Sequence, residues 1–314
     1  MVFDHGKMTT VRKETLEELK EDYNLYCADD VAYIYLSEGN PAKIYSDIEM
    51  NGISCDAIAN RHIITGEKGI KNVVIDNLCI KYGGIHGINF IDSENITIQY
   101  CELGYIGGAH PNCDTWCGNA IQFWENCDGA VIDHCWVYQV YDAGITHQAT
   151  KSIQQNVVFS NNLIEYCAYN IEYFVDLQEG EIKNVTYSDN ILRFAGGGWA
   201  HPHDRRGGVA GGADTGVALI CGWGSHGRTY ETTNFVIENN ILDTSYRYLL
   251  NISRPTEGRN AVISGNTYYQ VASENAAICI QDVRTQVDAT SDSQFKEEVA
   301  KIDATAKVVE FVEN

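Results

Sequence analysis

The chain has 314 residues, 44% of them apolar, and a formal net charge of −21 at pH 7. This charge disfavours nucleic acids and anionic membranes as partners, because their phosphates would be repelled. No run of about 18 apolar residues predicts a membrane span, and residues 1–22 lack the apolar stretch of a secretory signal, so we expect a cytoplasmic protein, or an extracellular one if the chain is an N-terminally shortened fragment.

The first segment, residues 1–44, is interpreted as an N-terminal cap with lead-in strands. Residues 15–26 predict a short helix, and residues 32–54 predict strands that enter the main body. A repeat array needs covered ends, since an open coil leaves unpaired strand edges. If this cap were incomplete, the exposed first coil would allow two copies of the chain to associate.

One short phrase recurs seven times in the central part of the chain. It begins with Asn or Gly, has apolar residues at its second and fourth places, and occurs at 72–75, 95–98, 129–132, 156–159, 184–187, 234–237 and 260–263. The starts are separated by 23, 34, 27, 28, 50 and 26 residues. Alternation with period two predicts strands, and a repeat of this length is typical of a solenoid.

Other positions also repeat after the phrase. Its seventh place is asparagine in four copies, which predicts a ladder of side-chain amides in left-handed turns about 4.8 Å apart; the four are Asn162, Asn190, Asn240 and Asn266. A second short strand and then a third strand follow, the third often entered through Gly or Asn. Three strands per repeat predict an all-β fold, namely a right-handed single-stranded parallel β-helix of about seven or more coils over residues 45–290.

The last segment, residues 291–314, is interpreted as the opposite cap. Residues 293–314 predict a helix followed by a final strand. This pair would cover the last coil, as residues 1–44 would cover the first.

Three longer strings, residues 118–126, 138–148 and 195–203, resemble stretches of bacterial β-helix proteins grouped with glycoside hydrolases. With the repeat, they make residues 45–285 resemble the pectate-lyase-like superfamily of right-handed parallel β-helix proteins. The resemblance implies a carbohydrate-active protein whose partner is a polysaccharide or oligosaccharide. A longer N-terminal part usually comes first in the relatives, so this chain resembles a shortened version.

Insertions between the repeats indicate where a site could lie. Loops at 104–117, 193–215 and 221–234 would border a groove across the third strands. We expect a first outward file of Asn89, Gln122, Thr146, Glu172, Ala218, Asn251 and Cys279. A second file would hold Ile91, Trp124, Gln148, Phe174, Ile220, Ser253 and Gln281. A polar file beside an aromatic one suits a sugar, although exposed aromatic rings could instead only stack on one another.

Four carboxylates are candidates for catalysis. Glu172 is the only carboxylate of the first file, and its expected surroundings suit a general acid. Asp142 would align with Asp214 two rungs away, roughly 9–10 Å, and Asp176 lies close to Glu172. Inverting glycosidases separate their carboxyls by about 6.5–9.5 Å and retaining ones by about 5–5.5 Å. The sequence does not choose between Asp142 with Asp214, Asp142 with Glu172, and purely structural roles.

A larger set of residues is a candidate for substrate binding. The loop "WAHPHDRR" (199–206) concentrates two histidines, an aspartate and two arginines, which suggests substrate orientation or proton transfer, or merely a solvated loop. His147 occupies a nominally inward place, which favours a core histidine. The whole set is Gln122, Trp124, Glu125, His147, Gln148, Trp199, His201, His203, Asp204, Arg205 and Trp223.

The leading functional hypothesis is a glycoside hydrolase that cleaves a plant or microbial glycan with paired carboxylates. A polysaccharide lyase is one alternative, with Arg205 and Arg206 near a uronate, although the net charge opposes it. A non-catalytic glycan-binding or structural β-helix is another, since Gln122 stands where a carboxylate would be useful. The 11 cysteines form no Cys-x-x-Cys pair, so we expect neither a metal site nor a cofactor.

Overall fold

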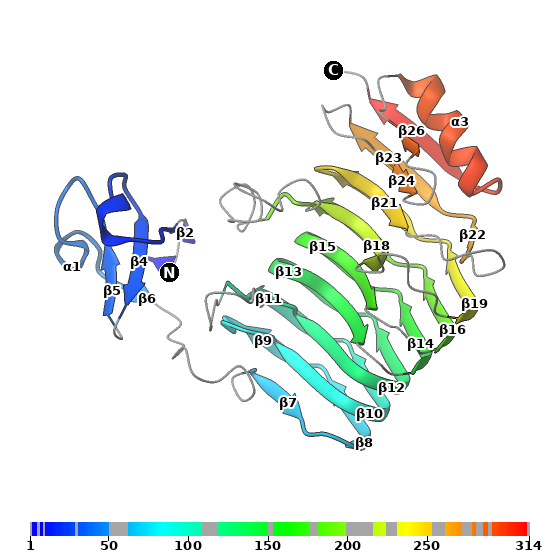
Figure 1. Cartoon of the computed structure of the whole chain (residues 1–314), viewed down its shortest axis with the longest axis horizontal. Helices are drawn as coiled ribbons and strands as arrows, with labels where there is room; N and C mark the ends of the chain where they lie inside the picture. Colours follow the sequence, from blue (N-terminus) through cyan, green and yellow to red (C-terminus); the bar gives the residue numbers. More distant parts are fainter. Residues whose placement is uncertain are drawn as a thin grey trace.

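The computed structural model describes residues 2–4, 7–8, 10–28, 31–49, 62–108, 118–149, 153–175, 181–198, 216–223, 231–252, 261–271, 278–280, 285–287 and 291–312. Over these residues the protein is all-β. A large sheet of 20 strands, nearly all parallel, accounts for most of the structure, and two three-stranded sheets are built by the N-terminal residues (Figure 1).

The N-terminal segment is mostly strand rather than helix. One small sheet contains β1 (Val2–Phe3), β2 (Lys7–Met8) and β6 (Ile48–Glu49), and the other β3 (Val11–Arg12), β4 (Asn24–Ala28) and β5 (Val31–Ile34). The helix expected over residues 15–26 is wrong. Only a 3₁₀ turn, Leu16–Glu18, forms there, and a four-residue helix, α1 (Pro41–Ile44), follows later. The turn buries none of its residues, so it lacks the apolar face that stabilises a helix.

The strands of the large sheet form three ladders. The first ladder runs through β7 (Ile64–Gly66), β10 (Ile88–Gln99), β12 (Ile121–Asp133), β13 (Trp136–Ala149), β15 (Leu163–Val175), β18 (Val217–Trp223), β21 (Tyr248–Ile252) and β24 (Ile278–Ile280). The second ladder runs through β8 (Lys71–Asp76), the later halves of β10 and β12, β14 (Gln154–Ser160), β16 (Glu181–Ser188), β19 (Glu231–Glu238) and β22 (Val262–Ser264). The third ladder runs through β9 (Cys79–Lys81), β11 (Glu102–Ile106), the first halves of β13 and β15, β17 (Ile191–Ala195), β20 (Ile241–Ser245), β23 (Thr267–Val271) and β26 (Val308–Val312).

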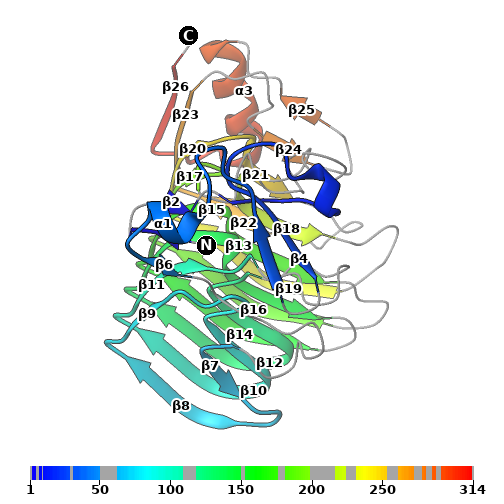
Figure 2. The same ribbon diagram turned by 90° about the vertical axis from the view of Figure 1, so that its left-hand side faces the viewer.

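The pairing within these ladders is parallel, and each strand pairs with the strand at the same place in the next repeat. The recurring phrases therefore align as predicted, with Val73 beside Ile96 and Ile96 beside Ala130. Successive rungs lie one above another in two perpendicular views (Figures 1 and 2). A short antiparallel hairpin between β24 and β25 (Thr285–Val287) is the exception among the described strands of this sheet.

The expected register fails at one rung of the first ladder. Glu172 pairs with Ile220, not with Ala218 as predicted. The physical reason is the core, because Leu219 is the residue that stacks between Ile171 and Leu250. Those inward positions are fully buried from β10 to β21, at Ile88, Ile121, Ile145, Ile171, Leu219 and Leu250.

The predicted asparagine ladder is confirmed, and we call it the buried ladder. The amide Nδ2 of Asn162 donates to Oδ1 of Asn190 (3.0 Å), Asn190 donates to Asn240 (2.9 Å), and Asn240 donates to Asn266 (3.0 Å). Asp303 ends the series, because its Oδ2 accepts from Asn266 Nδ2 at 3.1 Å. The left-handed backbone expected at these asparagines is wrong, since none of them has a positive φ.

Left-handed residues instead stand directly before these asparagines, at the sixth place of the phrase, and also at its first place. The asparagines at the first place form the exposed file, which consists of Asn72, Asn95, Asn156, Asn184 and Asn234, with φ between 53° and 57°. Gly129 holds the same place with a φ of 78°. Asparagine and glycine are the residues that adopt this conformation most readily, which explains why the phrase begins with one or the other.

The C-terminal expectation of a helix and a final strand is confirmed. Helix α3 (Asp292–Ile302) buries Phe295 and Val299, and Phe295 lies against Phe311 of β26 with ring centroids 5.5 Å apart. Strand β26 pairs in parallel with β23 and so continues the third ladder.

Candidate functional site

The outward positions of the first ladder carry a row of polar side chains, which we call the polar file. Its members are Asn89, Gln122, Thr146, Glu172 and Asn251, and the first four pair directly from strand to strand. All five are buried, between 0% and 7% exposed. Because buried polar groups need hydrogen-bond partners, the contacts of this file define what it can do.

Glu172 is held by the rung that precedes it. Its Oε2 accepts hydrogen bonds from Thr146 Oγ1 (3.1 Å) and from Gln148 Nε2 (2.6 Å). Thr146 lies directly opposite Glu172, and Gln148 lies two residues further along the same strand. Two donors on one oxygen fix the orientation of the carboxyl group, which is the preorganisation that a catalytic carboxylate requires.

A chain of neutral groups extends from Gln122 to the start of the ladder. Asn119 donates from Nδ2 to Gln122 Oε1 (2.6 Å) and from its backbone N–H to His86 Nδ1 (3.0 Å). The rings of His86 and His62 stack with centroids 5.0 Å apart. Burial, with a further contribution from the neighbouring His62, lowers the pKa of His86 to about 3, and burial also lowers the pKa of His62. Both imidazoles are therefore uncharged at neutral pH.

Asp142 lies at a buried irregularity of β13, at 8% exposure. The pairing of Ala143 with Tyr169 places Asp142 opposite Ala168, four residues before Glu172 in β15. A strand rise of about 3.3 Å per residue and one strand spacing put the two backbone positions at most about 14 Å apart. The pairing of Tyr169 with Val217 puts Gly216 on the next rung of that column. Asp214, with which Asp142 was expected to align, lies outside the described residues.

His147 belongs to the core and not to the groove. It follows Phe123 in an inward column, stacks on Tyr173 with centroids 4.8 Å apart, and is fully buried. Its Nδ1 bonds Gln154 Oε1 (3.3 Å), and its Nε2 bonds the hydroxyl of Tyr187. Burial lowers the pKa of His147 to about 3. This position corrects the prediction that His147 contacts substrate, because its ring reaches no solvent.

Three other predicted contacts lie at the end of this region. Trp124 is half-buried and pairs with Gln148. Glu125 is half-buried with a left-handed φ of 62°, and its carbonyl oxygen accepts a hydrogen bond from Gln154. Strand β18 reaches Trp223, whose backbone pairs with Phe174. The side chain of Trp223 and all of Asp176, Trp199, His201, His203, Asp204, Arg205 and Asp214 lie outside the described residues.

Asn119 and His86 are not among the predicted site residues, although they extend the polar file. Both lie just before a third strand, where a turn residue would be expected, and only the packing of neighbouring rungs shows that they bond to one another. Asn89 is 3% exposed, and its Oδ1 has no hydrogen-bond partner among the described residues. The signal that could have found them is the recurrence of polar residues beside Gly or Ala at the start of each third strand.

The polar file has little charge in the part that the structure describes. No lysine or arginine belongs to it, and no group of three or more His, Cys, Asp or Glu among the described residues could hold a metal ion. None of the described helices is long and apolar enough to cross a membrane. The arrangement suits hydrogen bonding to an uncharged polar ligand more than binding of an ion.

Comparisons of the chain with protein-family models, with curated proteins and with solved structures found no match in any of the three. The coarse fold stands on the strand pairing alone, as an all-β protein with a large parallel sheet.

Proposed function

We propose that the three ladders are the three faces of a right-handed parallel β-helix and that the protein is a glycoside hydrolase. The observation that carries the proposal is Glu172, a buried carboxyl group held by Thr146 and Gln148 in a file of neutral polar groups. The amide of the half-buried Gln148 would bond sugar hydroxyls, and Trp124 on β12, two strands before Glu172, would stack on a pyranose. A plant or microbial glycan of low charge fits such surroundings.

A hydrolase also needs a second carboxyl. The candidates are Asp142, Asp176, which is four residues after Glu172, and Asp214. In a retaining reaction one carboxyl attacks the anomeric carbon while the other protonates the leaving oxygen; in an inverting reaction one activates water. Glu172 fits the nucleophile or base, because Thr146 and Gln148 each offer it a donor that a carboxylate can accept from.

The test is Glu172→Gln assayed on a panel of neutral and uronate-containing polysaccharides. We expect release of reducing ends by the wild type and a loss of at least about 10³-fold in the variant, as in other enzymes that lose a carboxylate nucleophile or an equivalent group. The melting temperature should change little, because the Gln oxygen can still accept from Thr146 and Gln148. Glu238→Gln, on the second ladder, is the matched control and should keep full activity. Equal activity of both variants would contradict the assignment of Glu172.

A non-catalytic glycan-binding protein is the second candidate. It is favoured by the amide-rich file, in which Glu172 is the only carboxylate. The same panel separates the candidates: binding without new ends supports a binding protein, and unsaturated ends support a lyase.

A further inference from the structure

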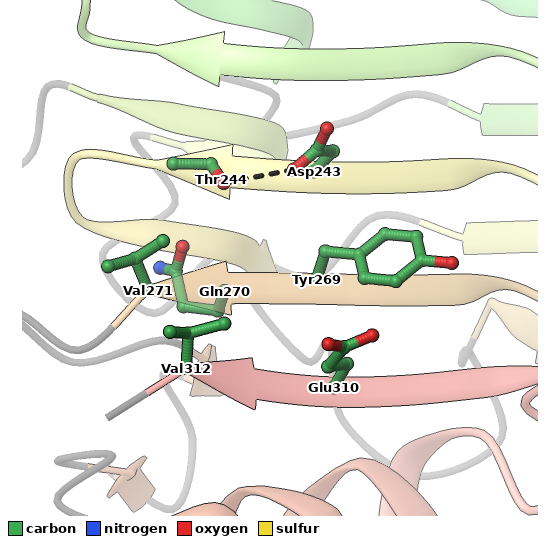
Figure 3. A pocket seen from close by; sticks show the side chains of 7 residues that line it. All are labelled: Asp243, Thr244, Tyr269, Gln270, Val271, Glu310 and Val312. Atoms are coloured by element: carbon green, nitrogen blue, oxygen red, sulfur yellow. Dashed lines mark hydrogen bonds between the residues drawn. The ribbon is translucent and has the colours of Figure 1, made fainter. Parts of the chain in front are cut away.

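A shallow depression on the outward side of the third ladder lies away from the polar file. It has a volume of about 400 Å³ and is lined by Asp243, Thr244, Tyr269, Gln270, Val271, Glu310 and Val312. These residues come from three consecutive strands, β20, β23 and β26. The register places Asp243 beside Tyr269 and Tyr269 beside Glu310, so the ring of Tyr269 lies between two carboxyl groups (Figure 3).

Asp243, Tyr269 and Glu310 belong to one outward column of the third ladder. The charged side chains of this column that lie outside the depression form ion pairs. Earlier along the third ladder Lys81 bonds Glu102 (2.6 Å), and Arg193 bonds Glu165 (2.7 Å). Arg193 is the neighbour of Asp243 in the column, but its guanidinium group is engaged by Glu165 and lies over the ring of Phe194.

The two carboxyl groups of the depression have no ion pair among the described residues. Asp243 accepts a hydrogen bond from Thr244 Oγ1 (2.9 Å), and Glu310 is exposed. Gln270 is not available to a ligand, because both ends of its amide bond Ser245. Two negative charges therefore flank one aromatic ring, with the exposed side chains of Val271 and Val312 beside them.

We propose that this depression binds a protonated amine with its ammonium group above Tyr269. Adjacent strands are about 4.8 Å apart, so a cation over the ring would lie about 5 Å from each carboxyl group. The ring adds a cation–π attraction, and Val271 and Val312 would contact the carbon skeleton of the ligand. A single metal ion does not fit as well, because its oxygen ligands must lie within about 2.6 Å, whereas the two backbone positions are about 9.6 Å apart.

The test is a titration of the whole chain with n-butylammonium, followed by NMR and calorimetry, with 1-butanol as the uncharged match. We expect millimolar binding of the amine at about 0.05 M NaCl, weakened at about 0.5 M, and at least tenfold weaker binding of the alcohol. Asp243→Asn and Glu310→Gln should each reduce affinity about fourfold, the value for one charge at about 5 Å in water. The double variant should reduce it about 16-fold, and Tyr269→Leu about two- to fivefold.

The control removes the same two charges elsewhere. Glu38→Gln with Glu67→Gln, both exposed and outside the depression, should change the affinity less than about twofold. Equal binding of butanol, unchanged binding in the double variant, or an equal loss in the control would each overturn the proposal. Melting temperatures show that the variants are folded.

Two sources of the amine are distinguished by glucosamine and its neutral match N-acetylglucosamine. Glucosamine binding as tight as that of butylammonium identifies an amino sugar, and weaker binding of glucosamine identifies a simple alkylamine. Equal binding of the two sugars would show recognition of hydroxyl groups and would overturn the proposal. The result is independent of the hydrolase test, because no residue of the polar file takes part.

Discussion

The buried ladder and the exposed file use asparagine for different physical reasons. In the buried ladder Asn190 Oδ1 accepts from the backbone and the side chain of Asn162, and its Nδ2 donates to Phe159 O and to Asn240. In the exposed file the side chain of Asn184 forms hydrogen bonds with Asn156 and Asn234, at 2.9 and 3.0 Å, and with no other described residue. The amides of the buried ladder donate toward the C-terminus and those of the exposed file toward the N-terminus. Hydrogen bonding explains the asparagines of the buried ladder, and backbone conformation explains those of the exposed file.

The largest effect is expected where the buried ladder is interrupted. Asn190→Ala leaves the donors of Asn162 and the carbonyl of Phe159 unsatisfied in the interior, and each such group costs about 1–3 kcal/mol. We expect the free energy of unfolding in urea to fall by about 4 kcal/mol. A loss below about 1 kcal/mol would show that the ladder does not stabilise the fold in this way.

A smaller, pH-dependent effect is expected at the end of the buried ladder. Burial tends to raise the pKa of Asp303, but hydrogen bonds from Asn266 and Thr305 outweigh it and lower the pKa below its ordinary value. The stability that this carboxylate contributes is therefore complete above about pH 4, its unfolded pKa, and is lost as the pH falls through the lowered folded pKa.

Asp303→Asn should cost about 2 kcal/mol at neutral pH, because a charged acceptor of several hydrogen bonds is replaced by a neutral amide. Urea unfolding of both proteins at neutral pH and near pH 3 checks this. The difference between them should narrow in acid, and a constant difference would contradict the role of the charge.

The smallest effect is expected in the exposed file. Asn184→Gly removes the side-chain contacts but keeps the left-handed backbone, so we expect a change below about 0.5 kcal/mol, as the natural Gly129 indicates. Asn184→Ala should cost about 1 kcal/mol, because Ala is strained at a φ of 53°. Thermal unfolding of the two variants measures this difference. If Asn184→Gly were less stable than Asn184→Ala, the side-chain hydrogen bonds would contribute more to stability than the backbone conformation.

The repeating strands and the buried ladder could be predicted from the sequence, because they follow from the period of the repeat and from residue type. The C-terminal helix and strand could be predicted as well. The rung after Glu172 could not be predicted, because Val217 and Leu219 are both apolar and a long insertion precedes them. Only stacking on Ile171 decides in favour of Leu219. The helix predicted over residues 15–26 was wrong for a related reason. The local sequence does not show that Asn24–Ala28 pairs with another strand.

The candidate site could be predicted only as far as its file positions. Thr146, Glu172 and Gln148 were placed beside one another correctly, because alternation fixes which side chains share a face. The burial of these residues and the hydrogen bonds of Asn119 depend on neighbouring rungs. The local sequence pattern therefore does not predict them. His147 is the clearest example. Its inward position could be predicted, but its hydrogen-bond partners could not, because Tyr187 and Gln154 come from other strands.

The buried ladder joins rungs that are 28, 50 and 26 residues apart in the chain, with amide contacts of 2.9–3.0 Å throughout. The connection between two rungs can therefore nearly double in length without altering the junction it spans. Lengthening a loop costs only a slowly growing closure entropy, so such a scaffold can acquire new surface by insertion and leave its interior untouched. Diversification of this architecture would then proceed through its connections, with the stacked asparagines preserving the frame on which each new segment is displayed.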